Sequence, residues 1–536
     1  MLDEDTVRRQ GKFFTPKIWV DEAHRMLDDN LGPDWRDEYV VWDCCWGTGN
    51  LTRDYRFKEL YCSTLIEDEL QLGGKYNPEA VKFQYDFLSE VGLDGLPEEA
   101  DGLRRAFAEG RKVLFLVNPP YGAAGNAGAK EGDHKAGIAK TVVHGGMKEC
   151  GAARRQLYVQ FIYKMAKLGG TVAAFSPPMF LTGPSFKKFR GFWLSKYRMS
   201  EGMLFQASEF ADVSGKWGIM FSLWQAGQDD RTSWEVVLKH SSEDLEHPVE
   251  VFGTKVLYNL DEAMLCSTWV REEVQGMKTY DAPQVASALV VKQAGRGKSV
   301  VGHVGYMSSS GNSVYDNGTF VYLVSGCSSS ANGLSVIPAN FLKCCALFTA
   351  RRTISRDWIN DKDEYQAPNE KHFDYEQWNN DAIVYSLFNS ASNQSSLRDV
   401  EYKGKTWQIK NEWFWLSHQT MVDLAEKHDN DSVQKDAEGD KDRYVHDALP
   451  GLPLSSKAQA VIDKATELVE KTFEFRAEAS TEHPEWHINT WDAGWYQIKL
   501  LLKTYLKDEL KAFRALYKEL GDDLREGVYE FGFLRR

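Results

Sequence analysis

Short apolar runs alternate with stretches of helical periodicity along the first 228 residues. Most runs end at a polar residue or a proline, which is typical of strands buried on both faces of a sheet. Between the runs, for example in residues 17–27 and 157–166, apolar residues recur every three or four positions and predict helices. The runs that predict strands are residues 39–42, 60–66, 81–85, 113–117, 171–175 and 218–224. This alternation predicts a Rossmann-like α/β domain over residues 1–228.

The pattern changes after a polar run at residues 228–231. Short alternating strands and turns rich in Gly and Ser follow, for example in residues 300–330, and predict a mixed α+β region over residues 229–450. From Ser455 the apolar spacing is helical again and predicts a helical region over residues 451–536. A chain of 536 residues is too long for one compact core, so we expect these three parts to be separate domains.

The apolar run 113–117 ends in Asn118-Pro119-Pro120-Tyr121. A strand must stop there, because proline cannot donate to a sheet ladder. Asn118 and Tyr121 are therefore expected at the carboxyl end of a strand, where open α/β sheets bind ligands. The Asn118 oxygen and nearby backbone carbonyls can accept N–H groups of a planar amine while the Tyr121 ring stacks on it. The alternative is a strand-terminating turn with a packed tyrosine.

Two further patterns flank the first predicted strand. Phe14-Thr15-Pro16 precedes it, and Thr15 there can also be read as a simple helix N-cap. Asp43 ends the strand and leads into Gly47-Thr48-Gly49. Glycines at such a turn let the backbone approach a ligand closely, although a mere tight turn has the same pattern.

Acidic residues follow the second and third predicted strands. Glu67, with Asp68 as the alternative in register, can accept hydrogen bonds from both hydroxyls of a ribose. A solvated acidic loop is the other interpretation. After the third strand, Asp86 and Phe87 combine a carboxylate and a ring, which can bind and pack an adenine.

In this order the motifs resemble those of the γ-class N6-adenine DNA methyltransferases, over roughly residues 11–225. The resemblance implies a class I methyltransferase fold in residues 1–228, S-adenosylmethionine as cofactor, double-stranded DNA as substrate, and a target-recognition role for residues 229–450. It implies that Asn118 and Pro119 accept the N6 amine while Tyr121 stacks on a flipped-out adenine. Its implied cofactor contacts are Phe14 and Thr15 on the methionine part, Asp43 near the ammonium group, Gly47 and Gly49 on the backbone-facing edge, Glu67 on the ribose, and Asp86 and Phe87 on the adenine.

Two predictions concern the DNA itself. An aromatic residue just before the strand at 218–224 packs against the extruded base in this family; we expect Phe210, with Phe205 as the alternative. Lys187, Lys188 and Arg190 lie on a basic helix and are expected to contact phosphates. The alternative for this helix is a solvated charged face over an aromatic core.

The composition of the chain restricts the classes of function that are open to it. The formal net charge of −14 argues against a protein that coats nucleic acid nonspecifically, but it allows a local basic lining. Scattered cysteines without Cys-x-x-Cys pairs argue against zinc or disulfides and for a reducing cytoplasm. We expect no metal site and no membrane span, and we expect His134 and His144 to be surface or phosphate-facing residues.

Three rival functions stay open at this stage. Asn-Pro-Pro-Tyr also fits methyltransferases of RNA or of a protein glutamine, although the Phe-Thr-Pro start and the long C-terminal half favour DNA. A catalytically inactive DNA-binding homologue is the second rival, and the intact Asn118 and Tyr121 argue against it. The third is a fused restriction–modification enzyme, for which we expect no nuclease ahead of Phe14. A separate restriction endonuclease as partner and an orphan or phage-borne role are both left open.

Overall fold

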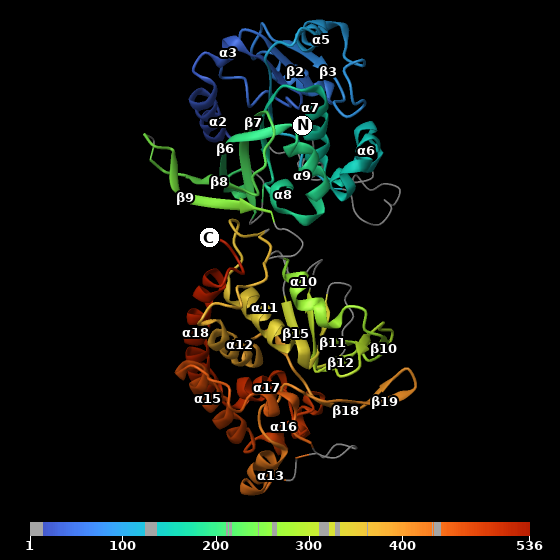
Figure 1. Ribbon diagram of the computed structural model, residues 1–536, viewed down its shortest axis with the longest axis vertical. Helices are drawn as coiled ribbons and strands as arrows, with labels where there is room; N and C mark the ends of the chain where they lie inside the picture. The colour runs from blue at the N-terminus through green and yellow to red at the C-terminus, as the bar shows by residue number, and fades with distance from the viewer. Residues whose placement is uncertain are drawn as a thin grey trace. The chain divides into compact units, whose positions relative to one another are not determined.

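The protein consists of two compact units in its computed structural model (Figure 1). The first comprises residues 1–260 and 357–362, and the second comprises residues 261–356 and 363–536. Every structural statement below refers to the described part of the chain, which is residues 14–123, 137–210, 213, 217–244, 246–259, 265–309, 321–326, 333–361, 363–430, 433 and 441–536.

The first unit is built on one nine-stranded mixed sheet with the order β3-β2-β1-β4-β5-β7-β6-β8-β9. Strands β3 to β5 in this order are parallel, whereas β7 runs antiparallel to both β5 and β6. The strands are β1 (Val40–Asp43), β2 (Leu60–Thr64), β3 (Val81–Gln84), β4 (Val113–Val117), β5 (Thr171–Ser176), β6 (Tyr197–Gln206), β7 (Gly218–Ala226), β8 (Ser233–Ser241) and β9 (Val249–Tyr258).

Alternate residues of the central strands enter two different cores. On β4, Phe115 and Val117 pack with one core, and Leu114 and Leu116 pack with the other. Helices therefore cover both faces of the sheet, and this confirms the predicted Rossmann-like α/β fold. The helices are α2 (Lys17–Leu31), α3 (Trp35–Glu38), α4 (Glu67–Gly73), α5 (Asp101–Ala108), α6 (Val142–Gly146), α7 (Leu157–Leu168), α8 (Met179–Thr182) and α9 (Lys187–Leu194).

The first unit does not end at residue 228. Strands β8 and β9 extend its sheet beyond β6, and the compact unit continues to Leu260. Within the polar run that resembled a linker, Asp229 is buried and forms a clasp, whereas Gln228, Asp230 and Arg231 are exposed. The Asp229 carboxylate accepts hydrogen bonds from Arg231 Nε at 2.7 Å, Arg231 Nη2 at 2.6 Å and Trp234 Nε1 at 3.1 Å. The predicted boundary at residue 228 is wrong, because the sheet continues through β8 and β9 and the buried Asp229 carboxylate ties the polar run to it.

We expect Asp229→Asn to destabilise the first unit by about 2 kcal/mol at neutral pH. Burial alone would raise the pKa of Asp229, but hydrogen bonds from Arg231, Trp234 and two backbone amides lower it from 3.8 to about 2. A lowered pKa means that this stabilisation is present above pH 4 and is lost as the pH falls through 2. Thermal unfolding at several pH values measures it. Asp230→Asn, at the exposed neighbouring carboxylate, is the control, and equal losses in both variants would contradict the clasp.

The second unit combines short strands with long helices. It contains a four-stranded sheet with the order β16-β14-β15-β17. It also contains three two-stranded sheets, β10-β13, β11-β12 and β18-β19. Its strands are β10 (Thr279–Asp281), β11 (Val285–Ser287), β12 (Val290–Val291), β13 (Lys298–Val300), β14 (Gly305–Ser309), β15 (Val321–Val324), β16 (Leu334–Val336), β17 (Ser392–Asn393), β18 (Leu397–Tyr402) and β19 (Lys405–Ile409). Its helices are α10 (Cys266–Arg271), α11 (Phe341–Thr353), α12 (Tyr375–Phe388), α13 (His418–Lys427), α14 (Tyr444–Ala448), α15 (Ser456–Thr472), α16 (Arg476–Glu482), α17 (Trp495–Tyr505) and α18 (Lys507–Glu530).

One hydrophobic core runs through the whole second unit. Phe348 of α11 and Val384 of α12 share it with Leu468 of α15 and Leu524 of α18. The helices after residue 451 therefore exist as predicted, but they do not form a separate domain. The reason is that their apolar faces are covered by α11 and α12 rather than by one another alone.

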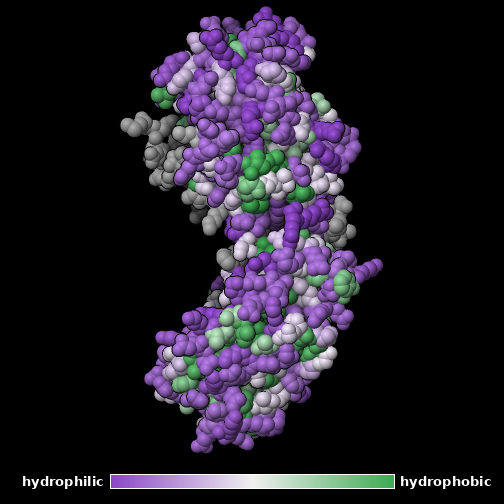
Figure 2. All heavy atoms as spheres, turned by 90° about the vertical axis from the view of Figure 1, so that its left-hand side faces the viewer, coloured by the Kyte–Doolittle hydropathy of each residue, from purple (hydrophilic) through white to green (hydrophobic). Residues whose placement is uncertain are grey.

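The surface agrees with the acidic composition. Figure 2 shows one face of the protein, on which hydrophilic residues predominate and hydrophobic residues form small separate areas. Among the described helices, none has both the length and the apolar content that crossing a membrane requires.

Candidate functional site

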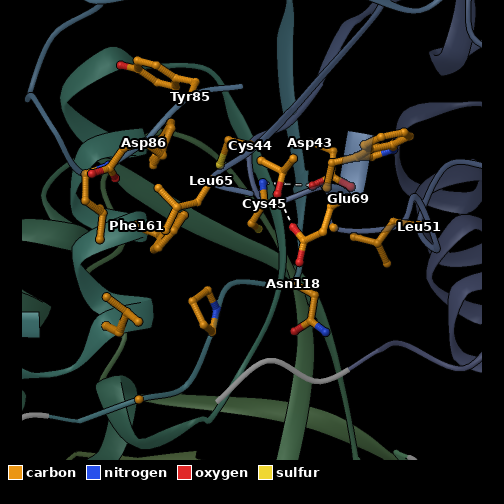
Figure 3. A pocket seen from close by; sticks show the side chains of 18 of the residues that line it. Asp43, Cys44, Cys45, Leu51, Leu65, Glu69, Tyr85, Asp86, Asn118 and Phe161 are labelled. Carbon is orange, nitrogen blue, oxygen red and sulfur yellow. Dashed lines mark hydrogen bonds between the residues drawn. The ribbon is translucent and has the colours of Figure 1, made fainter. Parts of the chain in front are cut away.

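A cavity of about 410 Å³ lies at the carboxyl ends of β1, β2, β3 and β4 (Figure 3). It brings the end of β4 together with the turn after β1 and with the segment before α2. The predicted site residues that line it are Phe14, Thr15, Asp43, Gly47, Asp86, Phe87, Asn118 and Pro120. Sequence reasoning did not select several others, among them Cys45, Thr64, Glu69, Tyr85 and Phe161.

Asn118 is held in one orientation at the end of β4. Its Nδ2 donates a hydrogen bond to Thr15 Oγ1 at 2.9 Å, which leaves Oδ1 as the acceptor. Thr15 is buried and does not cap α2, because the N-cap position is Pro16 and no side chain caps it. The Phe14–Thr15 segment is thus tied to the proposed catalytic corner, over a separation of 103 residues.

Tyr121 lies beside the cavity and donates its hydroxyl to Asn118 Oδ1 at 2.6 Å. Burial, together with Cys45 and Tyr158, raises the pKa of Tyr121 well above its usual value, so the phenol keeps its proton. Its ring meets Trp217 edge to face, with centroids 5.8 Å apart. Pro119 is not among the lining residues. At the end of β4, the acceptor Asn118 Oδ1 therefore already accepts a hydrogen bond from the Tyr121 hydroxyl.

Asp43, at the end of β1, is a buried residue of the cavity wall, and only one of its two carboxylate oxygens accepts a hydrogen bond. Its Oδ1 accepts the backbone N–H of Cys45 at 3.2 Å, as the dashed line in Figure 3 marks, whereas Oδ2 is buried without a hydrogen-bond partner. Burial raises the pKa of Asp43 to about 8. A buried carboxyl oxygen without a donor favours a ligand that brings a donor or a positive charge.

The two glycines of the turn after β1 have different roles. Gly47 has a φ of +55°, lines the cavity, and has open space where a Cβ would stand. Gly49 has a φ of +86° and faces the Trp46 ring, which would lie 3.0 Å from its Cβ. Trp46 is buried and donates to Thr52 Oγ1 at 3.1 Å. Gly47 thus opens the backbone to a ligand, and Gly49 makes room for the unusual tryptophan.

The structure corrects the carboxylate assigned to the ribose. Glu67 and its alternative Asp68 are exposed on the first turn of α4 and do not line the cavity. Glu69 does line it, is buried, and accepts a hydrogen bond from Thr64 Oγ1 at the end of β2. The helix begins at Glu67, so the residue two positions later turns inward.

The Asp86–Phe87 segment follows β3 at another wall. Asp86 is exposed, and its Oδ1 accepts the backbone N–H of Leu88 at 2.9 Å. The Phe87 ring is buried and stacks on Phe161 of α7, with centroids 5.3 Å apart. Beneath it, Lys164 Nζ lies 4.6 Å from the Phe87 centroid, and burial lowers the pKa of this lysine to about 8. The stacked Phe87 and Phe161 rings thus form an aromatic wall of the cavity, with the Asp86 carboxylate beside it.

Phe210 does not reach the site. It is buried among Phe175 and Phe205 in the core on one face of the sheet, and Phe205 is itself stacked on Trp19. The prediction for Phe210 and the alternative for Phe205 are therefore both wrong. Trp217, directly before β7, is the aromatic residue that contacts Tyr121, and its position next to the strand was the signal to follow.

The basic residues of helix α9 differ in their exposure to solvent. Lys187 and Lys188 are exposed, as the phosphate prediction requires. Arg190 is buried and donates to the carbonyls of Gly183 at 3.0 Å and Phe180 at 3.3 Å, so it holds the end of α8 instead of a phosphate. Of the glycine-rich segment after Tyr121, residues 124–136, including His134, lie outside the described part of the chain.

A scan against protein-family models finds no matching family, and a search of curated proteins finds no match. Solved structures give partial likenesses. The DrdV–DNA complex matches with 19% identity and a TM-score of 0.29, over 44% of this chain and 28% of the other. The type IIG restriction endonuclease BpuSI matches with 14% identity and a TM-score of 0.31, over 47% and 32%. The ATP-dependent type ISP restriction–modification enzyme LlaBIII bound to DNA matches with 11% identity and a TM-score of 0.38, over 97% and 47%. The present chain thus spans less than half of each of these proteins.

Proposed function

We propose that this protein is a DNA methyltransferase that transfers the methyl group of S-adenosylmethionine to N6 of adenine. One observation carries the proposal: a single cavity joins Asn118 at the end of β4 to the Asp43–Gly47 turn at the end of β1. An acceptor for an exocyclic amine and a pocket for a cationic cofactor are thus neighbours, as transfer between the two requires.

The lining suits S-adenosylmethionine in size and chemistry. A cavity of about 410 Å³ lies within the range of cofactor sites. The unpartnered Asp43 oxygen suits an ammonium group, and Glu69 suits ribose hydroxyls. Phe87 and Phe161 provide an aromatic wall against which an adenine ring can pack, with the Asp86 carboxylate beside it. When bound, the cofactor supplies an electrophilic methyl group.

Asn118 and Pro119 act on the amine. The hydrogen bond from Asn118 Nδ2 to Thr15 fixes the amide, so Oδ1 points away from Thr15 as an acceptor. Oδ1 and the Pro119 carbonyl accept hydrogen bonds from the N6 amine, which draws the nitrogen toward a tetrahedral shape and localises its lone pair. The target adenine is flipped out of the duplex, because N6 is not reachable within the stack. Catalysis is then positioning and electrostatics.

We expect Tyr121 to move when the base binds, because its hydroxyl takes one of the two acceptor positions of Asn118 Oδ1 and its ring has to turn to stack on the base. Its ring is then free to stack on the base, and Trp217 forms a second aromatic wall at the place proposed earlier for Phe210. The hydroxyl is a stand-in for the substrate N–H in the free protein, so displacing it exchanges one hydrogen bond for another at small net cost.

We expect Tyr121→Ala to weaken base binding by about 1–3 kcal/mol, through loss of stacking. Tyr121→Phe keeps the ring and removes only the competing hydroxyl, so its methylation rate should stay within about threefold of the original. Single-turnover methylation, with a fluorescent base analogue to report flipping, measures both variants. If the phenylalanine variant loses as much as the alanine variant, the hydroxyl rather than the ring is the functional group.

The function is tested by incubating the protein with labelled S-adenosylmethionine and either duplex DNA, RNA or a peptide release factor. The expected result is label on N6 of adenine in DNA at one sequence context, which single-molecule sequencing of DNA from expressing cells identifies. Label on RNA or on a protein glutamine would show that the proposed substrate is wrong, but it would leave the proposed catalytic site unchanged. Calorimetry that shows no binding of S-adenosylmethionine would overturn the proposal as a whole.

A further inference from the structure

A second, smaller cavity lies within the second unit and is unusually polar. Its volume is about 240 Å³, and it is bounded by the start of β18 and by the chain from α16 to the segment before α17, which Figure 1 shows side by side. The residues that line it are Arg398, Asp399, Ser480, Pro484, His487, Ile488, Asn489 and Thr490.

One buried guanidinium group, that of Arg398, lines this cavity, and two others, of Arg443 and Arg476, are linked to it through Asp492 and Ile488. Arg398 is 9% exposed, and its Nη2 donates to Asp492 Oδ1 at 2.9 Å. The same carboxylate accepts Arg443 Nε at 2.9 Å through its other oxygen, so one aspartate serves two arginines. Arg476, on the first turn of α16, is fully buried, and among the described residues no carboxylate contacts it. Burial lowers the pKa of Arg476 to about 9.

Three buried donors here have no acceptor within the described part of the chain: Arg398 Nε, Ser480 Oγ and Arg476 Nη2. Arg398 and Ser480 line the cavity. Arg476 lies one helical turn before Ser480, and its Nη1 donates to the carbonyl of the lining residue Ile488 at 3.4 Å. The Asp399 carboxylate is exposed at the rim and accepts Gln408 Nε2 at 2.8 Å. Donors and positive charge thus converge where acceptors are lacking.

We propose that this cavity binds a tetrahedral oxyanion, namely phosphate or sulfate, either as a free ion or as a phosphodiester of the DNA. A buried charge without a counter-charge is costly, and an oxyanion would supply both the missing charge and the missing acceptors. Guanidinium groups suit such oxygens because their N–H groups form a planar fork.

The test uses the full-length protein in phosphate-free buffer, to which sodium phosphate, sodium sulfate or sodium chloride is added at equal ionic strength. Phosphate and sulfate are expected to raise the thermal midpoint of the second unit by about 2–4 °C, and chloride is not. Ser480→Asp places a carboxylate in the cavity, so it should raise the midpoint without phosphate and abolish the response. Thr481→Asp adds the same charge at an exposed neighbour outside the cavity and should keep the response.

Ser480→Ala serves if the aspartate variant does not fold, and it should weaken phosphate binding by about 3–10-fold. Binding of a DNA duplex separates the two sources, and this arm alone rests on the proposed function. If the ligand is a phosphodiester, inorganic phosphate competes with DNA, and Ser480→Asp lowers DNA affinity about tenfold more than Thr481→Asp does. Equal DNA affinities with a lost phosphate response indicate a free ion. A phosphate response no larger than that of chloride, or unchanged in the Ser480 variants, overturns the proposal.

Discussion

Replacing Asn118 with alanine is expected to lower the rate of methyl transfer by about 10²–10³-fold, because the variant loses one of two preorganised acceptors for the amine. The fold should survive. The side chain is only partly buried, and its hydrogen bonds with Thr15 and Tyr121 are worth about 1–2 kcal/mol together. Single-turnover methylation measures the rate of methyl transfer. Thermal unfolding measures the stability of the variant, and a DNA-binding assay measures its affinity for DNA.

Asn50→Ala is the matched control for this prediction. Asn50 lines the same cavity and donates to the backbone carbonyl of Thr15 at 3.4 Å, so its loss disturbs the same segment while leaving Asn118 Oδ1 and the Pro119 carbonyl in place. It should raise the KM for S-adenosylmethionine more than it lowers kcat. If Asn118→Ala methylates DNA at the original rate, the role of this corner is refuted.

The sequence was most informative where an apolar run is buried on both faces. The runs at β1, β2, β4, β5 and β7 are almost wholly buried, and the structure has strands at each. The run at β3 alternates instead and is only partly buried, but the structure has a strand there as well. The ends of these runs fixed the site, because polar residues at the carboxyl ends of neighbouring parallel strands meet at one edge. Asp43, Asp86 and Asn118 were found in this way.

Strands at the far side of the sheet were not recognised. In β6, Arg198, Ser200 and Glu201 interrupt the apolar residues, and β8 alternates because one of its faces is less covered. Such strands read as parts of another domain when a polar run precedes them. The burial of Asp229 depends on contacts with Trp234 and with Met199 of β6, so no local pattern reveals it.

The errors at the site share one physical cause. Glu67, Phe210 and Arg190 each have the right chemistry at about the right place, but the direction of a side chain depends on the helix or core into which it is built. Glu69 was two residues from the prediction and Trp217 seven. A motif identifies the strand end, whereas packing decides which neighbouring side chain faces the cavity.

The affinity for S-adenosylmethionine is expected to fall about 50-fold between pH 8 and pH 6, with a proton released on binding at the lower pH. Burial raises the pKa of Asp43 to about 8, so this carboxyl is protonated in the free protein below that value. The ammonium group of S-adenosylmethionine favours the ionised form of Asp43. Binding must therefore release the proton from the Asp43 carboxyl. Calorimetry in buffers of different ionisation enthalpy measures both quantities.

Asp43→Asn should remove this pH dependence and weaken binding at pH 8 by about 10–100-fold, since a charged hydrogen bond is lost. Any titration of the ligand itself persists in the variant and is thereby separated. Asp86→Asn, at an exposed carboxylate of the same cavity, should keep the slope. A pH-independent affinity in the original protein, or an unchanged slope in Asp43→Asn, contradicts the assignment.

The same substitution should stabilise the free protein, and this makes the prediction two-sided. A carboxyl whose pKa is raised from 3.8 to about 8 by folding destabilises the fold progressively as the pH rises between these values. Asp43→Asn removes that cost, which linkage puts at about 5 kcal/mol at pH 8, but it buries an amide NH₂ group that costs part of this gain. The first unit should therefore be more stable than the original at pH 8, and near pH 4 it should gain nothing. A residue that weakens its own fold while binding a cation is retained for the ligand rather than for the core, and loss of both stability and affinity in Asp43→Asn would mark it as structural instead.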